Sequence, residues 1–172
     1  TNVATRHNLP SRSTSFIGRE TDIAEIIALL ADPACRLLTL AGPGGAGKTS
    51  LALEVVQHLD LADGMFFVPL QPLASVDNIV TTIAEALPLQ LHGNTDPQQQ
   101  LLNYLREKHI LLILDNFEHL LDGVSLVTDI LDAAPHVRLL ITSREALNVQ
   151  AEHLWPLGGL PIPPDDALDM FD

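Results

Sequence analysis

Residues 42–49 have the sequence Gly42-Pro43-Gly44-Gly45-Ala46-Gly47-Lys48-Thr49. They match the pattern G-x-x-x-x-G-K-[ST], in which backbone N–H groups of a glycine-rich loop surround phosphate oxygens. A mainly apolar run, residues 36–41, precedes the loop, and a helical pattern, residues 50–59, follows it. Because the motif requires a strand, a loop and a helix in this order, the stretch predicts a binding site for a nucleoside triphosphate.

Two side chains at the end of this loop have predicted roles in binding. Lys48 can reach the β and γ phosphates, and the hydroxyl of Thr49 can be a ligand of Mg²⁺. We expect the whole loop, together with Ser50, to contact ATP or ADP.

Apolar runs typical of strands alternate with helical patterns along the chain. Strands are expected at residues 36–41, 65–70, 110–114, 137–142 and 153–157. Helices are expected at residues 21–31, 50–59, 76–87, from 97 onward and 124–134. The central strands are apolar throughout, which is typical of a parallel sheet covered on both faces. The sequence therefore predicts an α/β fold, a three-layer P-loop NTPase with a five-stranded parallel sheet.

The order of the strands follows from the need for polar strand ends to surround one γ-phosphate. We expect the order 5-1-4-3-2, with the phosphate-loop strand central. The fourth strand should then separate the phosphate-loop strand from the third.

The helix that starts after residue 95 has a recognisable beginning. Asp96 is the expected N-cap, Pro97 occupies the first helical position, and Gln99 completes a pair that is similar to a capping box.

The third strand ends in an acid, as in a Walker B motif. Residues 110–116 read Ile-Leu-Leu-Ile-Leu-Asp-Asn, so a buried strand would hold the Asp115 carboxylate where it can orient Mg²⁺. The competing interpretation is that Asp115 caps the next helix. Hydrolytic relatives often carry an acid at the position of Asn116, whose amide can orient water but is not a base. Glu118 is the nearest acid and could activate water or stabilise a helix start, so we expect slow hydrolysis.

The fourth strand is followed by an arginine. Its end reads Thr142-Ser143-Arg144-Glu145, and in this architecture that tip lies next to the γ-phosphate. Arg144 could therefore sense the third phosphate. The alternative is that Arg144 caps a short helix through Glu145.

Composition argues against several classes of protein. The formal net charge of −13 argues against a nucleic-acid surface on this stretch. The single cysteine, Cys35, excludes an intramolecular disulfide and is typical of a reducing cytoplasm. No apolar run reaches the ~18 residues that span a membrane. The seven histidines lack the spacing of metal ligands and are expected to be scattered over the surface or strand edges.

Residues 1–15 are polar and are expected to be a linker or arm before a nucleotide-binding domain at residues 16–172. The chain lacks an initiator Met and stops in what looks like the first turns of a helix, so we expect a piece of a longer protein.

Taken together, these motifs resemble the STAND class of signal-transduction ATPases, in its NB-ARC-related bacterial branch. The resemblance rests on the phosphate loop, on residues 114–120 and 142–145, and on the segment Ser15-Phe16-Ile17-Gly18-Arg19-Glu20. Most similar are the ATPase modules of large bacterial transcriptional regulators and of tetratricopeptide-repeat proteins. In these, an Asn-Leu-Pro segment, here residues 8–10, precedes the Phe-containing motif.

The resemblance implies roles for individual residues. Phe16, Ile17, Gly18 and Arg19 would line the adenine and ribose, Asp115 would serve Mg²⁺, and Arg144 would contact the γ-phosphate. It also implies an ATP-driven switch that is closed with ADP and self-associates with ATP in the intact parent protein. On this resemblance the chain is expected to stop before the helical and winged-helix subdomains that follow in the family.

Two other functions stay open. A small-molecule phosphotransferase could share the loop, but it would need an arginine-rich lid, and the chain has only nine Lys and Arg. A nucleotide-binding scaffold without useful hydrolysis is kept open by Asn116. A GTPase is disfavoured because no Asn-Lys-x-Asp motif appears.

Overall fold

The computed structural model describes residues 20–43, 47–70, 78–93, 95–117 and 123–157. The elements in these ranges are α1 (Glu20–Ala31), β1 (Leu37–Ala41), α2 (Lys48–Val56), β2 (Met65–Pro69), α3 (Ile79–Ala86), α4 (Pro97–Leu105), β3 (Leu111–Asp115), α5 (Val124–Ala133), β4 (Arg138–Ser143) and β5 (Glu152–Pro156). All strand pairs are parallel, which confirms the predicted α/β class. The predicted arm, residues 1–15, lies outside the described residues.

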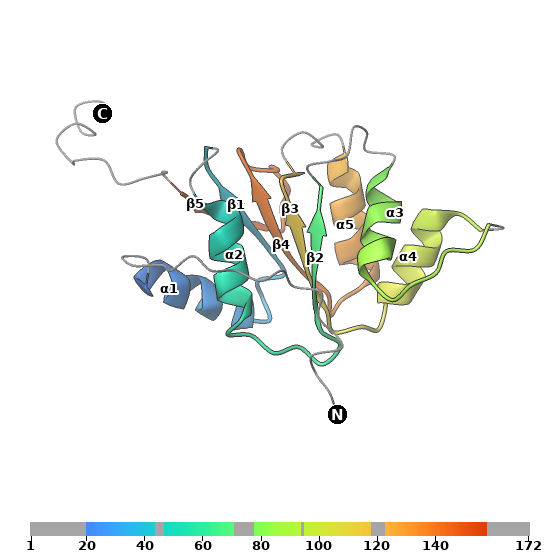
Figure 1. Cartoon of the computed structure of the whole chain (residues 1–172), viewed down its shortest axis with the longest axis horizontal. Helices are drawn as coiled ribbons and strands as arrows, with labels where there is room; N and C mark the ends of the chain where they lie inside the picture. Colours follow the sequence, from blue (N-terminus) through green and yellow to red (C-terminus); the bar gives the residue numbers. More distant parts are fainter. Residues whose placement is uncertain (1–19, 44–46, 71–77, 94, 118–122, 158–172) are drawn as a thin grey trace.

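The strands lie side by side in the order β2-β3-β4-β1-β5 (Figure 1), which is the predicted order seen from the other edge. β4 separates β1 from β3, as expected. The middle position, however, belongs to β4 and not to the phosphate-loop strand. β1 is an interior strand that pairs with β4 on one side and with β5 on the other. It lies one place from the edge of the sheet, because β5 is the last strand on that side.

Successive residues of each strand point to opposite faces of the sheet, and the core divides accordingly. On one face Leu38 and Leu40 of β1 pack with residues of α1 and α2. On the other face Leu37 belongs to a cluster that includes α3, α4 and α5. Figure 1 shows these helix groups on the two sides of the strands. Since both faces are covered, the central strands β1, β3 and β4 are mainly apolar instead of alternating, whereas the edge strand β5 is not.

The beginning of α4 agrees with the prediction only in part. Asp96 Oδ2 accepts a hydrogen bond from the backbone N–H of Gln99 at 3.0 Å, and Pro97 occupies the first turn. The side chain of Gln99 instead donates to Asn103 Oδ1, one turn further along, at 3.1 Å. Only half of the expected capping box therefore forms, because the Gln99 side chain bonds Asn103 instead of accepting from the backbone N–H of Asp96.

The remaining boundaries differ from expectation by a few residues. α2 begins at Lys48 instead of residue 50, because Gly47 ends the loop in the left-handed conformation with a φ of 82°. In the described ranges, no helix combines the length and the apolar character that crossing a membrane demands.

Candidate functional site

The carboxyl ends of the strands bring the predicted polar residues together. Parallel strands end at one edge of a sheet, so the start of α2 and the tips of β3 and β4 are neighbours. Thr49 Oγ1 donates a hydrogen bond to Asp115 Oδ1 at 2.6 Å. Thr142 Oγ1 donates to the same carboxylate oxygen at 2.8 Å. Three elements therefore meet at one carboxylate.

Asp115 is buried, with 5% of its surface exposed. Its second oxygen, Oδ2, accepts from Asn116 Nδ2 at 3.1 Å. Within the described residues, the side chains that bond this carboxylate are thus all neutral. None of these partners supplies a positive charge, so the site leaves room for a cation beside the carboxylate. The competing interpretation of Asp115 as a helix cap does not explain these contacts.

Asn116 turns the chain directly after β3. Its φ is 66°, a left-handed conformation that asparagine tolerates better than most residues. Its backbone N–H donates to Thr142 Oγ1 at 2.8 Å, while its amide bonds Asp115. Asn116 therefore orients the carboxylate, a role that the sequence did not suggest. The double contact of the fully buried Thr142 was also missed.

Lys48 is the first residue of α2 and is 7% exposed. Its Nζ donates to the carbonyl oxygens of Gly42 at 2.8 Å and Pro43 at 3.0 Å. The preceding residue, Gly47, has no side chain that could cap the helix. The first N–H groups of α2 and the Lys48 ammonium therefore face the same loop, and together they favour an anion.

Gly42 starts the loop in a tightly packed place. Its backbone N–H donates to the carbonyl of Ser143 at 3.1 Å, and Leu157 N–H donates to the neighbouring Ala41 carbonyl at 2.6 Å. A Cβ on Gly42 would lie 2.3 Å from the carbonyl oxygen of Leu157. Only glycine fits between β4 and the chain that leaves β5.

The exposed Arg144 directly follows β4. Residues 144–149 form no helix, so the alternative in which Arg144 caps a short helix has nothing to cap. Ser50 lies partly buried in the first turn of α2. Other predicted site residues lie outside the described residues: Phe16, Ile17, Gly18, Arg19, Gly44, Gly45, Ala46 and Glu118.

The residues at this edge fit a Mg²⁺ ion. Thr49 Oγ1 and Asp115 Oδ1 are hard oxygen donors that lie 2.6 Å apart on two different elements. Mg²⁺ prefers such oxygens, and proteins usually hold it with one or two side chains while the substrate phosphates supply further ligands. The Lys48 loop lies on the same side and can supply the phosphate contacts.

Comparison with known sequences places this arrangement in a family. The family model described as an AAA domain matches residues 32–149, which contain β1 to β4 and the site at their carboxyl ends. A Mycobacterium tuberculosis protein, named as a candidate HTH-type transcriptional regulator, is 37% identical over 137 residues. That alignment covers 79% of this chain and 15% of the relative. A second protein of that species, named as uncharacterized, is 30% identical over 172 residues and is covered to 43%. This chain thus spans less than half of either relative.

Solved structures share the fold at low sequence identity. Cdc6p from Pyrobaculum aerophilum superposes with a TM-score of 0.64 at 18% identity, covering 99% of this chain and 52% of that one. A STAND protein with a tetratricopeptide-repeat sensor from Pyrococcus horikoshii gives a TM-score of 0.58 at 17% identity, covering 94% and 26%. At these identities the likeness concerns the fold alone.

Proposed function

Because this chain belongs to the AAA domain family of P-loop ATPases, we propose that it is a Mg²⁺-dependent switch that binds ATP or ADP at the carboxyl edge of its sheet. The observation that carries the proposal is the convergence of Thr49 and Thr142 on the Asp115 carboxylate, beside the Lys48 loop. Charge, donor type and position all match a nucleotide phosphate with its metal ion.

Each residue at the site has a defined task in this function. Lys48 exchanges the carbonyl oxygens of Gly42 and Pro43 for phosphate oxygens, which are stronger acceptors because they are charged. Thr49 and Asp115 would hold Mg²⁺, which neutralises phosphate charge when it is bound. Thr142 keeps the carboxylate in place from the neighbouring strand.

We expect hydrolysis by this domain to be slow. Asn116 cannot accept a proton, and its amide already donates to Asp115. An arginine from a partner molecule typically adds about 10³–10⁵ in rate to P-loop enzymes, and a single copy of the domain has no such partner. Arg144, at the tip of β4, is our proposed sensor of the γ-phosphate.

We further propose that the domain regulates a larger signalling or transcription-regulating protein of the STAND type, which self-associates with ATP. The name of the mycobacterial relative and its much greater length support this proposal. A STAND protein among the structures that share the fold supports it too.

Calorimetry of nucleotide binding tests the site. Lys48→Ala should weaken binding of Mg·ATP and Mg·ADP about 100-fold, because the ammonium bonds several phosphate oxygens. Lys108→Ala is the matched control, since Lys108 lies over the Tyr104 ring near the other edge of the sheet. Equal affinities of the parent and Lys48→Ala would contradict the assignment, and so would a preference for GTP.

Hydrolysis assays separate the switch from the alternatives. A switch should give slow release of phosphate in a single turnover without any added acceptor. A scaffold would leave ATP intact, and a phosphotransferase would need an acceptor molecule.

A further inference from the structure

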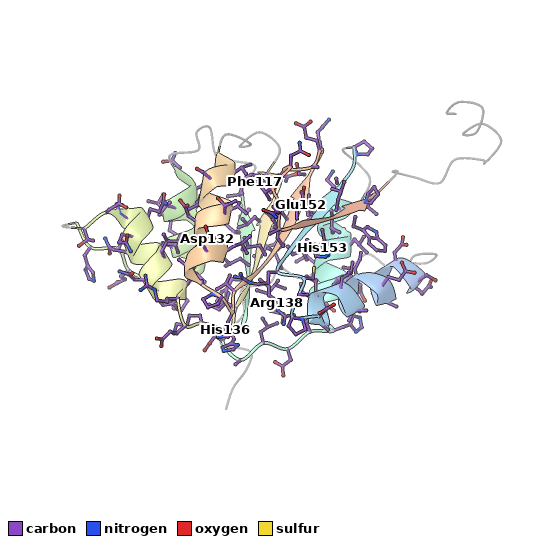
Figure 2. The ribbon with its side chains drawn as sticks, turned by 180° about the vertical axis from the view of Figure 1, so that it is seen from behind. Phe117, Asp132, His136, Arg138, Glu152 and His153 are labelled. Atoms are coloured by element: carbon purple, nitrogen blue, oxygen red, sulfur yellow. The ribbon has the colours of Figure 1, made fainter. Side chains whose placement is uncertain are left out.

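The amino edge of the sheet, opposite the nucleotide site, carries an open cavity of about 320 Å³. Segments that precede β1, β2, β3 and β4 line it, and its charged and ring-bearing residues are Arg36, Asp60, His109, His136 and Arg138. Figure 2 shows Arg138 and His136 close together at the lower edge of the molecule, whereas Phe117, which follows β3, lies near the upper edge. The volume lies at the small end of the range of ligand pockets, about 300–1,000 Å³.

Arg36 forms one wall of the cavity, and most of its N–H groups already donate to backbone carbonyls of the protein. Its guanidinium makes four hydrogen bonds to the carbonyls of Leu131, Ala134 and Val137, at and after the end of α5. Burial, and then the charge of Arg138, lowers the pKa of Arg36 from its usual value. Arg36 contributes positive charge to the cavity but has few N–H groups left for a ligand.

Arg138 is different because most of its donors are unused. Its Nη1 donates to the carbonyl of Leu30 at the end of α1. Its side chain makes no other hydrogen bond and no ion pair to the described parts of the chain. A guanidinium offers five N–H groups in a flat fork that matches the oxygens of a phosphate or carboxylate.

A pair of histidines supplies the second feature of the cavity. The rings of His109 and His136 stack with their centroids 4.3 Å apart and their planes 12° apart. Both side chains are exposed, and neither ring has a hydrogen bond to another described residue. The described residues contain no group of three His, Cys, Asp or Glu that could bind a metal ion, so the pair is not part of such a site.

Among the residues that line the cavity, positive charge exceeds negative charge, although acids outside the lining oppose it. Two arginines face one lining carboxylate, Asp60, and the partial negative ends of α1 and α5 offset part of their charge. Protonation of the histidines would add positive charge beside the free Arg138 fork. The other titratable groups nearby are Asp32, Asp63, Tyr104, Lys108 and Asp132.

We propose that this cavity binds the phosphate or carboxylate group of a small molecule, with Arg138 as the main donor and the stacked histidines as the element that makes binding pH-dependent. Charge-assisted bonds from a guanidinium to such an oxyanion are short and strong. The site lies at the other end of the strands from the proposed nucleotide site and does not depend on nucleotide binding.

NMR signals of the histidine rings test the proposal in the intact chain. Inorganic phosphate and acetate are titrated separately at constant ionic strength, at about pH 6 and about pH 8. The His109 and His136 signals should move saturably with each anion that binds, and acetate should bind more tightly at the lower pH. Acetate has the same charge at both pH values, so its titration isolates protonation of the protein. A response to phosphate alone identifies a phosphoryl ligand, and one to acetate identifies a carboxylate.

Variants locate the response. Arg138→Gln should abolish saturation, whereas Arg106→Gln should not, because Arg106 is exposed and bonds only Asn103 among the described residues. His136→Gln leaves the bond between Arg138 and the end of α1 intact. This variant should reduce the pH dependence of binding. Lys48→Ala should keep the response, which excludes phosphate bound at the loop. Parent-like binding by Arg138→Gln overturns the proposal, as does non-saturating drift of the histidine signals or loss of the response in Lys48→Ala.

Discussion

The two edges of the sheet hold charged side chains in opposite ways. At the carboxyl edge, Lys48 bonds two carbonyls of its own loop, and Asp115 bonds neutral side chains. A phosphate or a cation can compete for these contacts. At the amino edge, Arg36 is fixed by four bonds to the end of α5. Charged groups at the carboxyl edge can exchange these contacts for a ligand, whereas Arg36 at the amino edge holds a helix to the sheet.

The direction of the helices explains this difference. A helix that connects parallel strands runs back along the sheet, so helix N-termini gather at the carboxyl edge and C-termini at the amino edge. The first edge thus presents N–H groups that attract anions. The amino edge presents carbonyl groups that have no partner within their helix and are stabilised by cationic donors. Arg36 bonds a carbonyl at the end of α5, and Arg138 bonds one at the end of α1. The direction of the helix dipoles therefore favours a phosphate site at the carboxyl edge and arginines at the amino edge.

The largest effect should come from removing the arginine at the amino edge. Arg36→Met leaves several carbonyls near the end of α5 without a donor, and we expect the free energy of unfolding to fall by about 3 kcal/mol. Urea denaturation measures it, with Arg106→Met as an exposed control that should change little. Arg36→Lys should restore part of the loss, because it keeps the charge but not the fork. If Arg36→Met is as stable as the control, the carbonyls do not depend on Arg36.

A smaller loss is expected at the carboxyl edge from Gly42→Ala. The new methyl group would lie 2.3 Å from the Leu157 carbonyl oxygen, and overpacking of this kind costs about 1–3 kcal/mol. Gly93→Ala is the matched control, because a Cβ there meets nothing within 4 Å. Thermal unfolding of both variants measures the difference in stability. Equal stability would show that the backbone at Leu157, just after β5, can move aside freely.

Asn116 allows backbone and side-chain contributions to be separated. Asn116→Ala loses the contact to Asp115 and must also adopt a φ of 66°, so a loss of about 1–2 kcal/mol is expected. Asn116→Gly loses only the contact and should be the more stable variant. Urea denaturation that ranks alanine equal to glycine would rule out a contribution from the left-handed backbone.

The smallest effect should have the opposite sign. Thr39 in β1 is fully buried, and its Oγ1 has no hydrogen-bond partner in the described structure. Thr39→Val removes an unpaired hydroxyl at nearly constant volume and should raise the free energy of unfolding by about 1 kcal/mol. Thr142→Val is the comparison, because that hydroxyl bonds both Asp115 and Asn116 and its loss should destabilise the protein. Equal effects in the two variants would contradict this argument.

Much of the fold and of the carboxyl edge could be predicted because each piece is local. The rule that parallel strands end at the same edge of a sheet was sufficient to predict the strand order. It also predicted that the Lys48 loop and Asp115 lie at the same edge. The contacts of Thr142 were not predictable, because polar residues end many strands and only the register shows which atoms meet. The expected capping box at Asp96 was half wrong, since the Gln99 side chain bonds Asn103 instead of turning back to the backbone N–H of Asp96.

The stacked histidines show what pattern analysis overlooks. His109 and His136 are far apart in the chain and were expected to be scattered. Leu111 of β3 and Arg138 of β4 lie opposite each other in the sheet. His109 stands two residues before Leu111, and His136 stands two residues before Arg138. Equal offsets before neighbouring strands bring the two rings together, but this signal appears only once strand order and register are combined.

The close approach of Gly42 and Leu157 has a mechanical consequence for the phosphate loop. The chain passes from β5 directly over the first residue of the phosphate loop, where the Leu157 N–H bonds the Ala41 carbonyl. A movement of Gly42 toward Leu157 must therefore displace the backbone at Leu157, so the start of the phosphate loop and the chain that leaves β5 are mechanically coupled.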